Sequence, residues 1–148
     1  MPNRAMSPSG RCENSPLGGR TALPELLAPA GGFDQMLAAI VAGADAIYAG
    51  LDGFNARVSA HGSTDDEFAR GCAVAHAHGV RVYVTLNVFV FDDELDDAVA
   101  LGARALSLGA DALIVADAGL SRSLCEALPD VEIHLSTQAG VHSEGAVR

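Results

Sequence analysis

One unit recurs along this chain: a short apolar run that ends in Gly or a small polar residue, followed by an amphipathic stretch. The five runs cover residues 26–31, 46–50, 80–87, 112–117 and 133–138. Strands that alternate with helical patterns of ten or more residues are typical of βαβ units in a parallel sheet. The tetrapeptide Gly-Ala-Asp-Ala stands before two of the runs, at 43–46 and 109–112, which indicates an internal repeat.

Helical periodicity fills the stretches between the runs. The first helix is expected from Phe33 to a stop at Gly43, and the second from a capping box at Thr64 and Glu67 to a stop at Gly79. The third helix follows 92–93 and stops at Gly109, and the fourth runs from about 119 to 128. The third is expected to turn the following side chains inward: Leu95, Val99, Gly102 and Leu106.

The faces of the strands distinguish two α/β architectures. In 80–87, Val82, Val84 and Leu86 share one face, and the opposite face carries Tyr83, Thr85 and Asn87. In 132–138, His134, Ser136 and Gln138 likewise share one face. Central strands of a doubly wound sheet are apolar on both faces. We therefore predict an α/β fold, the N-terminal part (about five strands and four helices) of a (β/α)8 TIM-type barrel, a fold of ~250 residues. Tyr48, Tyr83 and His134 are expected to face its lumen.

The first 22 residues differ from the rest of the chain. They are rich in Ser, Pro, Gly and Arg and show no periodicity. We expect residues 1–22 to be a disordered N-terminal extension. Residues 23–148 are expected to form the partial barrel domain, truncated at its C-terminus.

Composition limits the classes of partner. The formal net charge of −10 disfavours contact with phosphate backbones. No apolar run approaches the ~20 residues that a membrane span needs, and no secretory leader is recognisable, so a cytoplasmic location is expected. The three cysteines, Cys12, Cys72 and Cys125, are far apart and lack CxxC spacing. No metal site is expected from them.

Active sites of β/α barrels lie at the C-terminal ends of the strands. The polar residues expected at this rim are Arg57, Asn87, Asp117, Ser136, Thr137 and Gln138. They suit a polar or anionic small molecule and include no obvious nucleophile–base pair, so the catalytic residues stay unknown. Each has a structural alternative: Asp117 as a helix N-cap, Ser136 and Thr137 as partners of strand-end amides, and His134 as a packed lumen residue.

Five segments in order resemble the N-terminal half of the U32 peptidase family, also called collagenase-like proteases. They read ELLAPAG (25–31), GADAIYAG (43–50), VYVTLN (82–87), ALIVAD (112–117) and HLSTQ (134–138). The resemblance covers about 23–141. It maps Arg57, Asn87, Asp117 and 136–138 onto family positions, whereas residues 61–63 depart from the family's Asn-Phe pair.

The resemblance implies a protease, or an enzyme that hydroxylates RNA bases or quinone precursors, with a peptide or RNA substrate. Several family members hold an iron–sulfur cluster through four cysteines that follow the Ser-Thr-Gln motif. This chain ends before that region, so we expect no cofactor in it. The chain alone is expected to be inactive, and whether it is an enzyme stays open.

Two other functions remain open. The first is a non-catalytic half-barrel that serves in binding or assembly, because an open arc of strands leaves edges through which a homo-oligomer forms. The second is an unrelated barrel enzyme that binds a small phosphorylated metabolite.

Overall fold

The computed structural model describes residues 24–51, 54 and 64–147. The expected extension, 1–22, and the candidate Arg57 lie outside these residues. Strands and helices alternate along the described chain, in this order: β1 (Leu27–Ala30), α1 (Phe33–Val41), β2 (Ala46–Ala49), α2 (Asp65–Ala77), β3 (Arg81–Leu86), α3 (Leu95–Ser107), β4 (Ala112–Val115), α4 (Ala118–Ala127), β5 (Ile133–Leu135), the 3₁₀ turn η1 (Thr137–Ala139) and α5 (Glu144–Val147).

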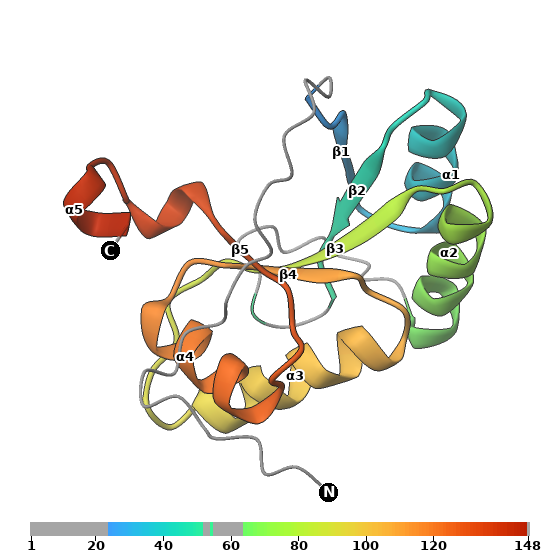
Figure 1. Cartoon of the computed structure of the whole chain (residues 1–148). Helices are drawn as coiled ribbons and strands as arrows, with labels where there is room; N and C mark the ends of the chain where they lie inside the picture. The colour runs from blue at the N-terminus through green and yellow to red at the C-terminus, as the bar shows by residue number, and fades with distance from the viewer. Residues whose placement is uncertain (1–23, 52–53, 55–63, 148) are drawn as a thin grey trace, which may run out of the picture.

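The five strands form one parallel sheet in the order β1-β2-β3-β4-β5. Helices α1 to α4 lie along one side of this curved sheet (Figure 1). A doubly wound sheet reverses its strand order at a switch point and carries helices on both faces. Sequential order with one-sided helices is instead the arc of a β/α barrel, which confirms the expected fold class.

The two faces of the sheet bury different side chains. The face under the helices carries the main core, to which β3 contributes Val82, Val84 and Leu86. The opposite face holds a small separate cluster of Ala46, Tyr83 and Ala112, against which Tyr48 and Ile114 pack. We call this second face the lumen face, because it is the side that a barrel of this handedness encloses.

The repeated Gly-Ala-Asp-Ala tetrapeptide marks a repeated contact. Asp45 Oδ2 accepts a hydrogen bond from the backbone N–H of Leu26 at 2.8 Å, and Asp111 Oδ2 accepts one from Val82 at 2.7 Å. Each aspartate also donates its own N–H to the carbonyl of the same residue, at 2.9 and 2.7 Å. Each aspartate therefore satisfies both the N–H and the C=O of one residue near the start of the preceding strand. These contacts fix the position at which the new strand joins it.

The helix ends follow the sequence signals. Thr64 Oγ1 accepts from the N–H of Glu67 at 3.3 Å and Glu67 Oε2 accepts from the N–H of Thr64 at 3.0 Å, which completes the expected capping box. Gly43 and Gly79 follow α1 and α2 with φ of 86° and 72°, a backbone conformation that side chains disfavour. Among the described helices, none is long and apolar enough to cross a membrane.

The inward face of α3 differs from the prediction. The buried residues are Ala98, Leu101, Gly102 and Ala105, whereas Leu95, Val99 and Leu106 lie only partly buried at its flanks. Small residues occupy the centre of this face because the helix lies close to its neighbours. A Cβ on Gly102 would stand 2.7 Å from Leu124 Cδ2 of α4. Gly102 is buried as expected, and Leu95, Val99 and Leu106 pack against the core from the flanks of the buried stripe.

The fifth strand is shorter than predicted. It ends at Leu135, and Ser136 begins the turn η1, in which Ser136 Oγ accepts from the N–H of Gln138 at 3.2 Å. Gln138 therefore does not continue the strand alternation. Leu135, whose parity is opposite to that of the lumen residue His134, is 57 % exposed at this edge of the sheet.

Replacing Asp111 with Ala should lower the free energy of unfolding by about 1–3 kcal/mol, because the N–H of the fully buried Val82 loses its acceptor. Asp111→Asn should retain most of the stability, since its amide oxygen still accepts. Urea unfolding measures both. An Asp111→Ala midpoint equal to that of the wild type would contradict the proposed role of the carboxylate.

Candidate functional site

Three of the predicted rim residues follow neighbouring strands. Asn87 follows β3, Asp117 stands two residues after β4 and Ser136 follows β5. Because the strands are parallel and adjacent, their C-terminal ends meet at one edge of the sheet. The fold thus brings Asn87, Asp117 and Ser136 to the same edge.

Asp117 caps the helix that it precedes. Its Oδ1 accepts a hydrogen bond from the N–H of Leu120 at 2.8 Å, and its backbone is extended, as an N-cap requires. This contact occupies Oδ1 at the first turn of α4. The structural alternative for Asp117 is therefore present in the fold, and contact with a ligand stays a prediction.

Ser136 joins the end of β5 to the turn η1. It is buried, its N–H donates to the carbonyl of Val115 at 2.8 Å, and its hydroxyl caps the turn. Thr137 and Gln138 follow it in η1 and are exposed. Ser136 thus positions two exposed polar residues at the rim, while its own oxygen holds the backbone of that turn.

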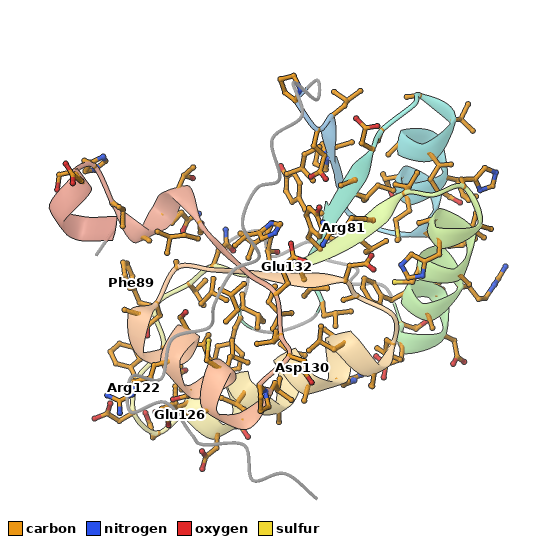
Figure 2. All side chains as sticks on the ribbon, viewed as in Figure 1. Arg81, Phe89, Arg122, Glu126, Asp130 and Glu132 are labelled. Carbon is orange, nitrogen blue, oxygen red and sulfur yellow. The ribbon has the colours of Figure 1, made fainter. Side chains whose placement is uncertain are left out.

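A polar network occupies the lumen face below this rim. Arg81 Nη2 donates to Glu132 Oε2 at 2.6 Å, and His134 Nε2 lies 2.8 Å from Glu132 Oε1. The His134 ring meets the edge of Tyr83 with centroids 4.6 Å apart, and Tyr83 donates its hydroxyl to Glu25 at 2.9–3.0 Å. Figure 2 shows Arg81 and Glu132 beside each other between β3 and β5. We call these five residues the lumen network.

Small residues on the even strands allow this network to form. Ala112 of β4 lies opposite Tyr83 in the register, and Ala46 of β2 lies opposite Arg81. Both alanines are fully buried. Side chains of β3 therefore reach across β4 to those of β5, as in the layers that alternate strands build inside β/α barrels. Tyr48 lies beside Tyr83 in the register and packs on the same cluster.

The network shifts the pKa values of its members. Burial would raise the pKa of Glu132, but hydrogen bonds from His134 and Arg81 and the charge of Arg81 outweigh it and lower that pKa. Burial and the hydrogen bond to Glu25 raise the pKa of Tyr83 to about 12. For Arg81, burial opposes the charged form, but the hydrogen bond to Glu132 prevails and raises its pKa. At neutral pH, Glu132 is thus a carboxylate and Tyr83 a neutral donor.

Sequence reasoning missed three members of the network: Glu25, Arg81 and Glu132. Two of them carry a signal, because Arg81 has the strand parity of Tyr83 and Glu132 that of His134. Reading the alternation two residues back from Tyr83 and from His134 would have found them. Glu25 precedes β1 and shows no comparable pattern.

The Cys72 thiol is not an activated nucleophile. Burial, with the nearby charge of Asp111, raises the pKa of the Cys72 thiol to about 12. Cys72 belongs to the core under the helices, away from the lumen face. Within the described part of the chain, no three His, Cys, Asp or Glu side chains are grouped so as to hold a metal ion.

Two aromatic side chains are exposed to solvent in the loop from β3 to α3. Phe89 and Phe91 are 73 % and 74 % exposed. Figure 2 shows Phe89 pointing away from the body of the fold. Val90, between them, packs against the core and anchors the loop.

The fold and the rim together define a segment of a β/α-barrel protein with a polar rim above a charged lumen. A family model described as Peptidase family U32 matches residues 31–148. The chain belongs to this family, as its sequence motifs indicated.

Relatives within the family carry different activities. The chain is 41% identical over 119 residues to the "23S rRNA 5-hydroxycytidine C2501 synthase" of Escherichia coli, covering 80% of the chain and 18% of that protein. It is 34% identical over 128 residues to "tRNA hydroxylation protein P1" of Bacillus subtilis (86% and 30%), and 31% identical over 125 residues to the "Collagenase" of Porphyromonas gingivalis (84% and 30%). The chain thus spans less than a third of these relatives.

A solved structure supports the fold. "The Structure of the U32 Peptidase Mk0906" superposes with a TM-score of 0.67 at 14% identity, over 90% of this chain and 56% of that one. At this identity the likeness concerns the fold alone.

Replacing Glu132 with Gln should destabilise the protein at neutral pH by no more than about 1 kcal/mol, since Arg81 and Glu132 are both partly exposed. The pKa of Glu132 is lower in the folded protein, so this difference is complete above pH ~5 and disappears as the pH falls below the usual glutamate range. Urea unfolding at several pH values measures this difference in the free energy of unfolding. Val41→Ala, at an exposed position of α1, serves as the control variant. A difference that grows towards acid pH would contradict the role of the ion pair.

Proposed function

We propose that this chain forms the base-binding rim of a U32 protein that hydroxylates RNA bases, and that the chain alone does not turn over substrate. The observation that carries the proposal is the identity to relatives named for rRNA and tRNA hydroxylation, 41% and 34%. Because those named substrates are RNAs, we also propose a cytoplasmic location.

The chemistry of the rim suits a nucleobase. Asn87, Thr137 and Gln138 offer amide and hydroxyl groups, and Asp117 offers a carboxylate. These groups hydrogen-bond to the edges of unstacked bases, which is how proteins read single-stranded RNA. The chain's charge of −10 repels phosphates. We therefore assign contact with the base to this chain, and not contact with the RNA backbone.

The same residues explain why we propose no turnover by the chain alone. Hydroxylation of a base is an oxidation, and amides, hydroxyls and carboxylates carry no redox group. The iron–sulfur cluster implied by the family resemblance needs cysteine thiolates, and Cys72 is a buried thiol whose pKa is raised to about 12. We assign that cluster to other parts of longer family members and derive no step through it.

Proteolysis is a second candidate, favoured by the 31% identity to a collagenase. It requires an activated nucleophile or a metal-bound water. Ser136 holds the turn η1 with its hydroxyl, and no histidine of the described residues hydrogen-bonds to its Oγ. The rim therefore favours base binding over peptide hydrolysis.

A binding or assembly module is the third candidate, favoured by the sheet edges. Leu26 and Leu27 at the β1 edge and Leu135 at the β5 edge expose large apolar side chains. Unpaired strand edges with such side chains associate with further strands. We propose that these edges pair with further β/α units or with a second copy.

A chimera tests the proposed function. In an E. coli strain that lacks the 23S rRNA synthase, this chain replaces the matching 119-residue segment of that enzyme. Mass spectrometry of rRNA nucleosides should detect 5-hydroxycytidine with the chimera and none with the chain alone. An Asn87→Ala chimera should give at least tenfold less. Absence of 5-hydroxycytidine from a folded, expressed chimera would contradict the proposal.

The isolated chain should not cleave gelatin, and it should sediment as a dimer or larger species because its strand edges are open. Zymography and analytical ultracentrifugation over a range of concentrations measure the two properties. Inhibitor-sensitive cleavage by the purified chain would favour the protease instead. A monomer at all concentrations would contradict pairing of two copies.

A further inference from the structure

The lumen network contains a histidine, His134, that belongs neither to the rim nor to the apolar core. We propose that Glu132 holds His134 as the Nε2–H tautomer, so that Nδ1 presents a hydrogen-bond acceptor to an N–H group of an uncharged nucleobase. The choice of a nucleobase rests on the proposed function; the tautomer does not.

The tautomer follows from the donors and acceptors around Glu132. Its Oε2 accepts from Arg81 and its Oε1 lies 2.8 Å from His134 Nε2. A carboxylate is only an acceptor, so the proton of this bond belongs to Nε2. A neutral imidazole with its proton on Nε2 has an unprotonated Nδ1. Arg81 keeps Glu132 ionised, and thereby keeps this arrangement in place.

The orientation of the ring is fixed as well. The imidazole stands at 72° to the ring of Tyr83 with centroids 4.6 Å apart, a favourable edge-to-face geometry. Tyr83 is itself held by Glu25 at its hydroxyl and by Arg81, whose Cζ lies 5.0 Å from the ring centroid. Glu132 and Tyr83, which have contacts of their own, therefore fix the orientation of the His134 ring.

The histidine is partly exposed near the end of β5. It lies two residues before Ser136, which is one pleat, or ~7 Å, below the strand end. Its side chain is 36% exposed, in contrast to the buried Tyr83 beside it. Within the described part of the chain, Glu132 is its hydrogen-bond partner and Tyr83 its ring contact. Nδ1 is the ring atom left for a ligand.

Charge selects the class of ligand. Arg81 is paired with Glu132, and Glu25 adds a second carboxylate to the network. An anionic ligand would meet a network with two carboxylates against the single cation Arg81, with the unpaired excess at Glu25 beside the Tyr83 hydroxyl. An uncharged ring with an N–H donor, such as the amino group of cytosine, meets an acceptor and no repulsion. The same charges disfavour a phosphorylated metabolite in this lumen.

Nitrogen NMR of the intact chain, with ¹⁵N-labelled histidine, tests the tautomer. At about pH 8, above the ordinary histidine range, the neutral His134 ring should show a pyrrole-type Nε2 and a pyridine-type Nδ1. Glu132→Ala should mix the two tautomers, whereas Glu126→Ala, which removes a carboxylate from the exposed pair with Arg122, should leave the signals unchanged. A wild-type His134 with its proton on Nδ1, or a Glu132→Ala spectrum equal to that of the wild type, would overturn the proposal.

The ligand is tested with cytidine and cytidine 5′-monophosphate as probes. Cytidine should shift the Nδ1 signal, and the monophosphate should bind at least threefold more weakly. Equal or tighter binding of the monophosphate, or no shift with cytidine, would overturn the choice of ligand.

The chimera separates this inference from the proposed function. A His134→Phe chimera should lose at least tenfold of the 5-hydroxycytidine that the unmodified chimera produces, with the Glu132→Ala chimera as a second variant should His134→Phe fail to fold. Full product from a folded His134→Phe chimera would overturn the inference and leave the proposed function standing. Loss of product from the unmodified chimera would instead count against the proposed function.

Discussion

The structure depends on one constraint: helices cover only one face of the parallel sheet, so every strand must present an apolar face and a separate lumen face. On the covered face, apolar side chains are buried under α1 to α4. On the lumen face, fully buried alanines at positions 46 and 112 leave space into which the long side chains of β3 and β5 extend. Polar residues meet on this face because Arg81 and Tyr83 of β3 reach Glu132 and His134 across the intervening strand β4.

That arrangement determines what the site can bind. The ion pair of Arg81 and Glu132 neutralises the cation that would otherwise attract a phosphate, and the same carboxylate orients His134. At the rim above, Asp117 and Ser136 use oxygens to hold the first turns that follow β4 and β5. The rim is thus built by capping interactions, and Thr137 and Gln138 are its exposed residues beside Ser136.

Several elements were predictable from local patterns, and the misses have a common cause. Capping boxes, glycine stops and strand parity depend on neighbours in the sequence, and these predictions agree with the structure at Thr64, Gly43 and Val82. Along α3 the predicted residues Leu95 and Val99 pack against the core only from its flanks, and the close approach of Leu124 to Gly102 shows how little room the centre leaves. The end of β5 was misplaced because the Ser136 hydroxyl stabilises a turn that parity does not reveal.

The sequence by itself determined the repeating β/α unit, the order of its strands, the family and the polar character of the rim, because each of these is encoded in residues close together along the chain. Only the tertiary structure decided which polar groups meet. Arg81 and Glu132 stand 51 positions apart, and Glu25 and Tyr83 58 apart. Such pairs form only once parallel strands are set side by side in a fixed register, and no local pattern records which partner lies across the sheet.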